Sequence, residues 1–455
     1  MRLIARYAKE AENNFEIVTV WDEEIHREQV SKRDPRIKTL TKTHPAAIWF
    51  ERKMHDDYGI IIEDAFDNRP LVHQERFPGD IYPMRKDFRE RTLEPDDYKP
   101  YKYEAIGGDG VFEVAVGPIH AGIIEPGHFQ FSQAGEDMLH QEVRHFYKYR
   151  AIEKMLEGKT LFEAKPVIER ISGNESIAYQ TAWRDIVLQA TDRELPLDNR
   201  KYHALLLELE RTVHHLTDLG FIPNDAGFGA ALAFGSKLSE EARRELKKIT
   251  GHRFGFGAID FESHSLDNEA MKAYLDTLNE AIAFFEAWII DIPSLWDRFD
   301  TTGILKLKKA VKYDTVGIVA RASGLALDQR NEPFYLEHGF ALQTQKSGDV
   351  SARFKIRLEE MKNTLEMMQN FTVETCESMN VGTVTDGEYF SFAESSIGEL
   401  FMSIEIKEGV IERFFVRDPS FVNWQALHLM MPGNIIADFP LINKSCDLSY
   451  AGNDL

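Results

Sequence analysis

The sequence predicts an α+β fold, in which a small α/β domain precedes a mainly helical core with short peripheral sheets. Three segments carry apolar side chains at every third or fourth position, at 201–219, 268–289 and 353–369. This spacing places the apolar groups on one face of a helix, as packing in a bundle requires. Runs of strand type lie before and after these helices, at 15–21 and within 386–421.

The domain organisation follows from shifts in composition. Residues 1–90 mix short apolar runs with dense charge, which predicts the small α/β domain. Residues 91–110 are rich in proline, glycine and charge, and we expect a linker there. The large domain is expected at 111–455, and it opens at 111–131 with two extended runs around a Gly/Pro turn, which predicts a hairpin.

The charge balance and the apolar runs exclude several classes of protein. The chain of 455 residues has 54 basic and 75 acidic side chains, a net charge of −21, which argues against a nucleic-acid partner. No apolar run approaches the roughly 20 residues of a membrane span. Residues 1–14 are charged and lack an apolar stretch of signal-peptide type, so we expect a cytoplasmic protein.

The two cysteines, Cys376 and Cys446, limit the cofactors that the chain can bind alone. They are too few for an iron–sulfur cluster or a zinc ion held by four thiolates. In a cytoplasmic chain we expect two reduced, buried thiols in preference to a disulfide.

Two stretches of the N-terminal part resemble a known subunit. "HPAAIWFERKMHDDYGI" (44–60) and "FPGDIYPMRKDF" (77–88) are similar to the 30-kDa-type peripheral subunit of respiratory complex I. The positions that match its pattern are Trp49, Glu51, Arg52, Asp56, Gly59, Ile60, Pro83, Arg85, Lys86, Asp87 and Phe88.

The rest of the chain resembles the large subunit of [NiFe] hydrogenases. "VGPIHAGIIEPGHFQF" (116–131), "YKYRAIEKMLEGKT" (147–160) and "VGIVARASGLALDQR" (316–330) are similar to blocks of the membrane-bound, energy-converting branch. That branch includes formate hydrogenlyase and is related to the 49-kDa-type subunit of complex I. The order of the two parts is typical of the formate hydrogenlyase type. The resemblance implies a hydrogenase large-subunit-like helical core behind the small domain.

The residues that hold the metals in that family are replaced here. The nickel–iron site needs four thiolates from two C-x-x-C motifs, because soft sulfur ligands hold these metals. The first frame, "ERISGNES", has Ser172 and Glu175 at the thiolate positions. The second frame, "DLSYAG", has Ser449 and Gly452. The resemblance with these substitutions predicts a degenerate site without nickel and iron.

Two further departures support this prediction. Relatives have an arginine above the metals where this chain has Ile397. They also carry a C-terminal extension that is removed after nickel insertion, whereas this sequence ends at Leu455. We therefore expect that the chain is not itself an active hydrogenase.

The relation to complex I raises the alternative of a quinone pocket. Such a pocket uses a tyrosine together with a histidine–aspartate pair, and Tyr147 lies at the tyrosine position. The other two positions hold Ile124 and Ser172, so the proton-donating set is incomplete. Tyr147 is either a donor to a quinone or a packing residue, and the second reading is the simpler one.

Other polar residues have two readings as well. His120, Glu125 and His128 lie in the turn that in relatives lines a path toward the membrane arm. They either relay protons or form a hydrogen-bonded structural turn, which we favour. A buried Glu175 needs a partner or a raised pKa, and we expect Arg150 or Arg321 as that partner.

Structural ion pairs are a further expectation. Arg321, Asp328 and Arg330 belong to "ARASGLALDQR", and Arg150 lies in the tyrosine block. We expect these charges to stabilise the fold and not to take part in catalysis.

The resemblance as a whole implies a subunit of a membrane-bound respiratory or energy-converting oxidoreductase complex. It implies electron transfer to a quinone-like or sulfur acceptor coupled to ion translocation, or alternatively a non-catalytic structural and coupling role. The expected partners are an iron–sulfur small subunit, which carries the clusters, and antiporter-like and other integral membrane subunits. This chain is expected to bind no cofactor itself, with NAD or quinone linked at the level of the complex. It would be peripheral on the inner face of the cell membrane through its partners.

Overall fold

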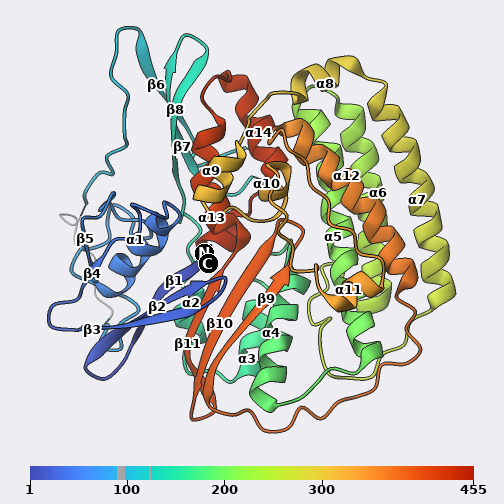
Figure 1. The fold of residues 1–455 in the computed structure, drawn as a ribbon, viewed down its shortest axis with the longest axis horizontal. Helices are drawn as coiled ribbons and strands as arrows, with labels where there is room; N and C mark the ends of the chain where they lie inside the picture. The colour runs from blue at the N-terminus through green and yellow to red at the C-terminus, as the bar shows by residue number, and fades with distance from the viewer. Residues whose placement is uncertain (90–97, 122–123) are drawn as a thin grey trace.

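The computed structural model describes residues 1–89, 98–121 and 124–455. A small sheet domain at the N-terminus lies beside a larger helical part, and two further three-stranded sheets lie next to the helices (Figure 1). The predicted α+β fold with a mainly helical core is confirmed.

The N-terminal part is an antiparallel sheet covered by one helix. The sheet has the order β1-β2-β3, and the predicted strand at 15–21 is β2. Helix α1 packs on β1, and β4 and β5 form a short parallel pair. The bounds are β1 (Leu3–Glu10), β2 (Asn14–Trp21), β3 (Ile25–Ser31), β4 (Arg36–Lys38), α1 (Ala47–Tyr58) and β5 (Ile61–Glu63).

This N-terminal sheet packs against a C-terminal sheet, β9 (Gly387–Glu394), β10 (Glu399–Lys407) and β11 (Val410–Arg417), which arises from the predicted strands. The Tyr7 ring stacks on Phe415 at 4.3 Å, and its hydroxyl lies 2.8 Å from the Ser403 hydroxyl. The two ends of the chain therefore share one core. The domain boundary stays a prediction. Of the expected linker, residues 91–97 lie outside the described residues and 98–108 form no helix or strand.

The predicted hairpin at 111–131 is present. Strands β6 (Val111–Val116) and β7 (His128–Ala134) pair antiparallel, and β8 (Asp137–Arg144) completes the sheet. The turn between β6 and β7 contains His120 and Glu125, so the sheet fixes where this turn begins and ends.

The helical core follows β8, and α5, α6, α7 and α12 lie side by side in it (Figure 1). The predicted stripes are confirmed, since Leu275 and Ile282 of α7 and Phe354 and Leu365 of α12 are buried. The helices are α2 (Ile152–Leu156), α3 (Leu161–Ile168), α4 (Ser176–Thr191), α5 (Leu197–Asp225), α6 (Gly229–Thr250), α7 (Asn268–Ile290), α8 (Pro293–Phe299), α9 (Leu307–Lys312), α10 (Gly317–Ala322), α11 (Pro333–Glu337) and α12 (Val350–Asn370).

Two glycines let α5 and α6 approach closely. A Cβ atom on Gly235 would lie 2.6 Å from the Leu216 carbonyl oxygen and 2.9 Å from the Cα of Gly220. A side chain there would push the two helices apart. Close packing against α5 therefore explains the glycine at position 235 of α6.

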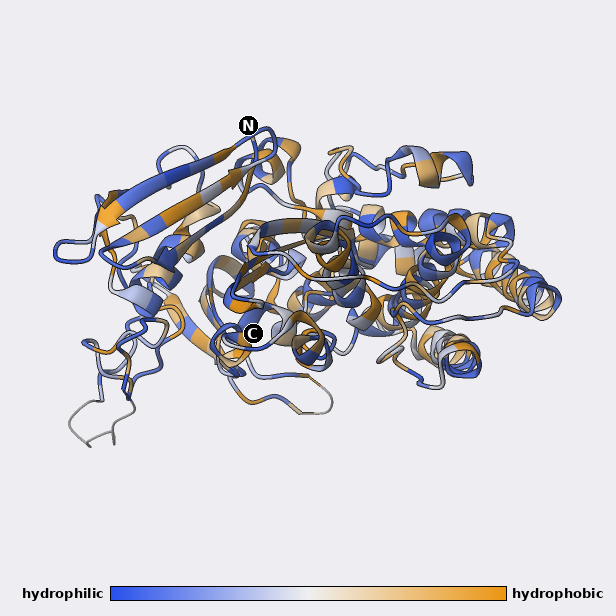
Figure 2. Ribbon diagram, turned by 90° about the horizontal axis from the view of Figure 1, so that it is seen from below, coloured by the Kyte–Doolittle hydropathy of each residue, from blue (hydrophilic) through white to orange (hydrophobic). Residues whose placement is uncertain are grey.

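The chain ends in short helices that return to the centre of the molecule. They are α13 (Pro419–Leu427), η2 (His428–Met430), η3 (Ile436–Asp438), α14 (Phe439–Cys446) and α15 (Tyr450–Asp454). Cys376 and Cys446 are both free and buried, as predicted. Hydrophobic and hydrophilic residues alternate along the helices, as amphipathic packing requires (Figure 2). None of the described helices is both long and apolar enough to cross a bilayer.

Candidate functional site

The structure brings the two predicted ligand frames together. Ser172 lies in the turn before α4, and Glu175 is the residue that precedes this helix. Ser449 precedes α15, and its hydroxyl accepts a hydrogen bond from the Gly452 amide at 2.9 Å. The Ser172 and Ser449 hydroxyl oxygens are 3.2 Å apart, although the residues are 277 positions apart in the chain. A helix thus begins at each ligand frame, and the two helix starts meet inside the protein.

A carboxylate fills the space in front of Gly452. A Cβ atom on Gly452 would lie only 2.1 Å from Oδ2 of Asp418. Asp418 precedes α13, and Oδ1 accepts the Ser420 amide at 2.8 Å. Its Oδ2 accepts the Tyr179 hydroxyl at 2.7 Å. Asp418 and Tyr179 are both fully buried, so this interaction is shielded from solvent.

The remaining space is small. A cavity of about 10 Å³ lies beside Asp418 and Gly452, with apolar walls that include Phe50 and Phe421. Such a volume is at the limit for a single water molecule. The Asp418 side chain thus occupies the space that a thiolate on residue 452 would need.

Glu175 is buried beside Asp418, with 1% of its surface exposed. Among the described residues its carboxylate oxygens accept no hydrogen bond from a backbone amide or an arginine, and their neighbours are Asp418 and Ser395. Burial and the adjacent Asp418 charge raise the pKa of Glu175 well above its ordinary value. Asp418 has the Tyr179 hydroxyl and the Ser420 amide to stabilise its charge. Of the two, Glu175 is therefore the carboxyl group that holds a proton.

The expected arginine partners of Glu175 are wrong. Arg150 donates to the carbonyl oxygens of Ile171 at 2.7 Å and Ala451 at 2.8 Å, and in the described part of the chain it pairs with no carboxylate. Arg321 pairs with other carboxylates. Arg150 is thus not the structural ion pair that we expected; it ties the two ligand frames together through their backbones, because their carbonyl groups point to it.

A third carboxyl group caps α4 from a neighbouring helix. Glu210 of α5 accepts the amides of Ile177 at 2.7 Å and Ala178 at 3.1 Å, in the first turn of α4. Burial raises the pKa of Glu210 to about 8, although these amides oppose the shift. Glu210 therefore fixes the helix that follows the first ligand frame.

The donor set does not fit a nickel–iron centre. The four positions offer two hydroxyl groups, one carboxyl group and a glycine, whereas these metals are held by soft thiolates. Among the described residues, no group of three or more His, Cys, Asp or Glu side chains is arranged to hold a metal ion. The serine and Asp418 oxygens are instead used in hydrogen bonds within the protein.

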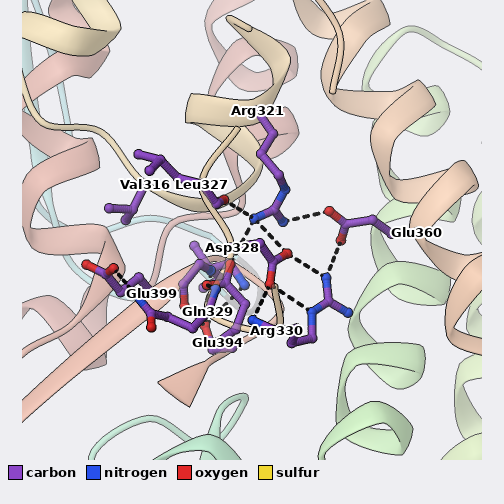
Figure 3. Close-up of polar contacts among 12 residues, drawn as sticks. Val316, Arg321, Leu327, Asp328, Gln329, Arg330, Glu360, Glu394 and Glu399 are labelled. Atoms are coloured by element: carbon purple, nitrogen blue, oxygen red, sulfur yellow. Dashed lines mark hydrogen bonds and ion pairs between the residues drawn. The ribbon is translucent and has the colours of Figure 1, made fainter. Parts of the chain in front are cut away.

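A buried ion-pair network surrounds Arg321 (Figure 3). The Arg321 guanidinium lies 2.6 Å from Glu360, 2.8 Å from Glu394 and 3.2 Å from Asp328. Arg330 lies 2.8 Å from Asp328 and 3.2 Å from Glu208. These contacts join α5, α10, α12 and the end of β9. The structure thus places Arg321, Asp328 and Arg330 in one cluster of buried charges.

The network contains more carboxylates than guanidinium groups. Arg211 adds a pair with Glu208 at 3.0 Å, so among the described residues three arginines meet four carboxylates: Asp328, Glu208, Glu360 and Glu394. Burial and the Asp328 charge raise the pKa of Glu394 to about 7. Burial opposes ionisation of Glu360 too, but the Arg321 charge holds the pKa of that carboxyl well below its ordinary value. Glu394 therefore carries the excess proton near neutral pH.

Tyr147 lies away from these clusters. Its ring is 5.4 Å from the Arg144 guanidinium, and the side chain is partly exposed. Burial and a hydrogen bond with Tyr103 raise the pKa of Tyr147 above its ordinary value. The Tyr147 hydroxyl group therefore stays protonated at neutral pH. It lies close to the Tyr103 phenol and the Arg144 guanidinium.

The turn residues do not pair with one another. His120 donates to the Gly127 carbonyl oxygen at 2.7 Å, and His128 lies 3.2 Å from the Gln130 side-chain oxygen. Glu125 pairs with Lys148 and accepts the Ala451 amide at 2.9 Å. These contacts form a hydrogen-bonded turn attached to α15 and do not arrange the three groups as a relay.

Several residues of the site were not found from the sequence. Tyr179 and Glu210 lie inside helices, where the sequence gives no sign of a polar role. For Asp418 the signal is the Asp-Pro-Ser start of α13, which is typical of a carboxylate that caps a helix. His145 was also missed. It is buried under the turn, 4.2 Å from the Trp424 ring, and burial lowers its pKa to about 3, so it is neutral.

We expect Arg321→Met to destabilise the chain strongly. It leaves Glu360 and Glu394 buried without their nearest cation and Asp328 with Arg330 alone, at a cost of about 3–5 kcal/mol. Arg298→Met, which removes the part-exposed pair with Asp438, should cost no more than about 1 kcal/mol. Urea unfolding of both variants measures the difference, and equal costs would show that the Arg321 network does not stabilise the core.

We expect Glu175→Gln to alter the pH dependence of stability. In wild type the pKa of Glu175 is raised in the folded state. The folded chain therefore keeps a proton on Glu175 that the unfolded chain releases above pH about 4.5. The contribution of Glu175 to wild-type stability therefore falls with rising pH, and the variant should gain relative to wild type by up to about 1.4 kcal/mol per pH unit. Unfolding at several pH values, with exposed Glu366→Gln as control, tests this. A pH-independent difference would contradict it.

Comparison with known families covers most of the chain. The model of the 49 kDa subunit of respiratory-chain NADH dehydrogenase matches residues 225–382 and 366–454. The model of the 30 kDa subunit of the same enzyme matches residues 3–93. The two parts are thus fused in one chain, in the order that the resemblance implied.

Individual relatives agree with this. Formate hydrogenlyase subunit 5 of Escherichia coli is 27% identical over 446 residues, with 94% of this chain and 78% of the relative covered. An NADH-quinone oxidoreductase subunit of Solibacter usitatus is 25% identical over 334 residues, with 69% and 89% covered. A chain of the membrane-bound sulfane sulfur reductase, an archaeal respiratory membrane complex, has the same fold, with a TM-score of 0.71, 19% identity and coverage of 76% and 99%.

These relatives are subunits of hydrogenase-type and complex I-type assemblies. The match of the 49 kDa model extends over half of the chain, and the preceding sheet domain matches the 30 kDa model. The chain belongs to the family of the 49 kDa subunit of respiratory-chain NADH dehydrogenase, fused to a domain of the 30 kDa type.

Proposed function

We propose that this chain is a non-catalytic structural and coupling subunit of a membrane-bound oxidoreductase complex. The observation that carries the proposal is the Asp418 carboxylate in front of Gly452, in the space that a thiolate on residue 452 would need. The serines, the glycine and this carboxylate support a degenerate site that would not hold nickel and iron.

The partners follow from the family. Formate hydrogenlyase and the NADH-quinone oxidoreductases are the complexes named for the relatives. We propose an iron–sulfur small subunit and antiporter-like membrane subunits as neighbours of this chain. The chain would then be peripheral on the inner face of the membrane through them, and NAD or a quinone would enter only at the level of the complex.

Purification of the complex from native membranes in mild detergent tests the proposal. We expect co-purification of an iron–sulfur subunit and integral membrane subunits, with iron but no nickel in metal analysis. Asp418→Asn keeps the shape of the side chain, so complexes that assemble with this variant should retain their turnover. Nickel in proportion to this chain, or a chain that purifies alone, would contradict the proposal.

A second candidate is electron transfer to a quinone-like or sulfur acceptor at Tyr147. It is supported by the partly exposed phenol next to Tyr103 and the Arg144 cation, an arrangement that can donate a hydrogen bond to an acceptor. Such a role would require the hydroxyl group itself.

Tyr147→Phe separates the two candidates. We expect the assembled complex to keep its turnover, because a structural and coupling role makes no use of the Tyr147 hydroxyl. Tyr149→Phe, two residues further on and beside the Lys53–Asp57 pair, controls for the loss of a partly buried phenol. If the first variant alone abolishes electron transfer while the complex assembles, the redox role at Tyr147 is the correct one.

A further inference from the structure

A short basic segment stands out on the surface of this acidic chain. Residues 304–312, with the sequence ILKLKKAVK, contain four lysines and no acidic residue, whereas the chain as a whole has a net charge of −21. The segment runs into α9, which lies beside α10 (Figure 1). We call residues 304–312 the basic strip. Its lysines are Lys306, Lys308, Lys309 and Lys312.

The lysines of the basic strip are exposed and have no acidic partner. All four side chains lie at the surface. Elsewhere lysines such as Lys53 and Lys444 form ion pairs, but none of these four pairs with a carboxylate in the described part of the chain. Their positive charge is therefore available to a negatively charged surface.

Aliphatic side chains lie among the lysines. Ile304, Leu307 and Val311 are 37%, 47% and 52% exposed. Leu307 and Val311 are one helical turn apart, so they point to the same side of α9. The strip therefore presents exposed aliphatic groups next to exposed ammonium groups.

The backbone of the strip is firmly held. Leu305 and Ala310 are buried and anchor its inner side. The Leu305 amide donates to the Gly348 carbonyl at 2.9 Å, and the Thr315 amide donates to the Ala310 carbonyl at 3.2 Å. The exposed lysines and aliphatic groups are thus presented on a fixed surface.

We propose that the basic strip binds the headgroup region of an anionic lipid bilayer. Lysines with neighbouring aliphatic side chains suit this surface, because the ammonium groups contact lipid phosphates while the apolar groups enter the interface. The cores of protein–protein interfaces, by contrast, are depleted in lysine. This contact goes beyond the proposed function, in which only partner subunits attach the chain to the membrane.

The charge of the rest of the chain gives the contact an orientation. A chain with net charge −21 is repelled by anionic lipid overall, whereas the basic strip is attracted to it. The strip therefore selects which side of the subunit approaches the membrane. The bilayer contact would be weak by itself and would add to attachment through partners.

Flotation of the purified full-length chain with lipid vesicles tests this. We expect binding to phosphatidylcholine vesicles that contain phosphatidylglycerol, little binding to phosphatidylcholine alone, and loss of binding as salt is raised. Replacing Lys306, Lys308, Lys309 and Lys312 by Gln should weaken partitioning more than about tenfold.

A matched variant separates the strip from total charge. Replacing four exposed lysines of α6 and α7, Lys237, Lys247, Lys248 and Lys272, by Gln changes the net charge equally and should leave binding as in wild type. Leu307→Ser with Val311→Ser should lower the binding that remains at high salt. Equal loss in both lysine variants, or no binding of wild type to anionic vesicles, would overturn the proposal. Binding to an acidic polypeptide but not to vesicles would assign the strip to a protein partner and overturn it as well.

Discussion

The core of this protein depends on the rule that a charge removed from water must be paired. Arg321 is fully buried and meets three carboxylates from separate elements, Asp328, Glu360 and Glu394. A buried pair is not in itself strong evidence for stability, because desolvation offsets the attraction. Once the charges are buried, however, each fixes the position of the others. The relative placement of α5, α10, α12 and β9 is thereby specified by polar contacts in addition to apolar packing.

The same rule explains the contacts at the two predicted ligand frames. Helices α4 and α15 both start there, and the unpaired amides of a helix start need acceptors. Glu210 supplies them for α4, and the Ser449 hydroxyl for α15. Asp418 then occupies the space over Gly452, held by Tyr179. The two frames are thus kept in place by hydrogen bonds to carboxyl and hydroxyl groups.

The sequence predicted the elements better than the contacts among their polar groups. The stripe containing Leu275 and Ile282 predicted α7, because periodicity shows which face of a helix is buried. The meeting of Ser172 and Ser449 was predicted through the resemblance. Glu175 was assigned the wrong partners, Arg150 and Arg321, because periodicity does not show which buried groups from different elements meet. Asp418 was missed for the same reason.

The polar core also determines where protons are held. Glu175 keeps a proton because the neighbouring Asp418 has the better hydrogen bonds, and Glu394 does so because four carboxylates share three arginines among the described residues. Both protons depend on burial, since water would stabilise the ionised carboxylates and lower their pKa. By linkage, any rearrangement that opened the contacts among α4, α13 and β9 would release protons, and proton release would in turn favour the opened arrangement. The conformation of this core and the protonation of Glu175 and Glu394 are therefore thermodynamically linked.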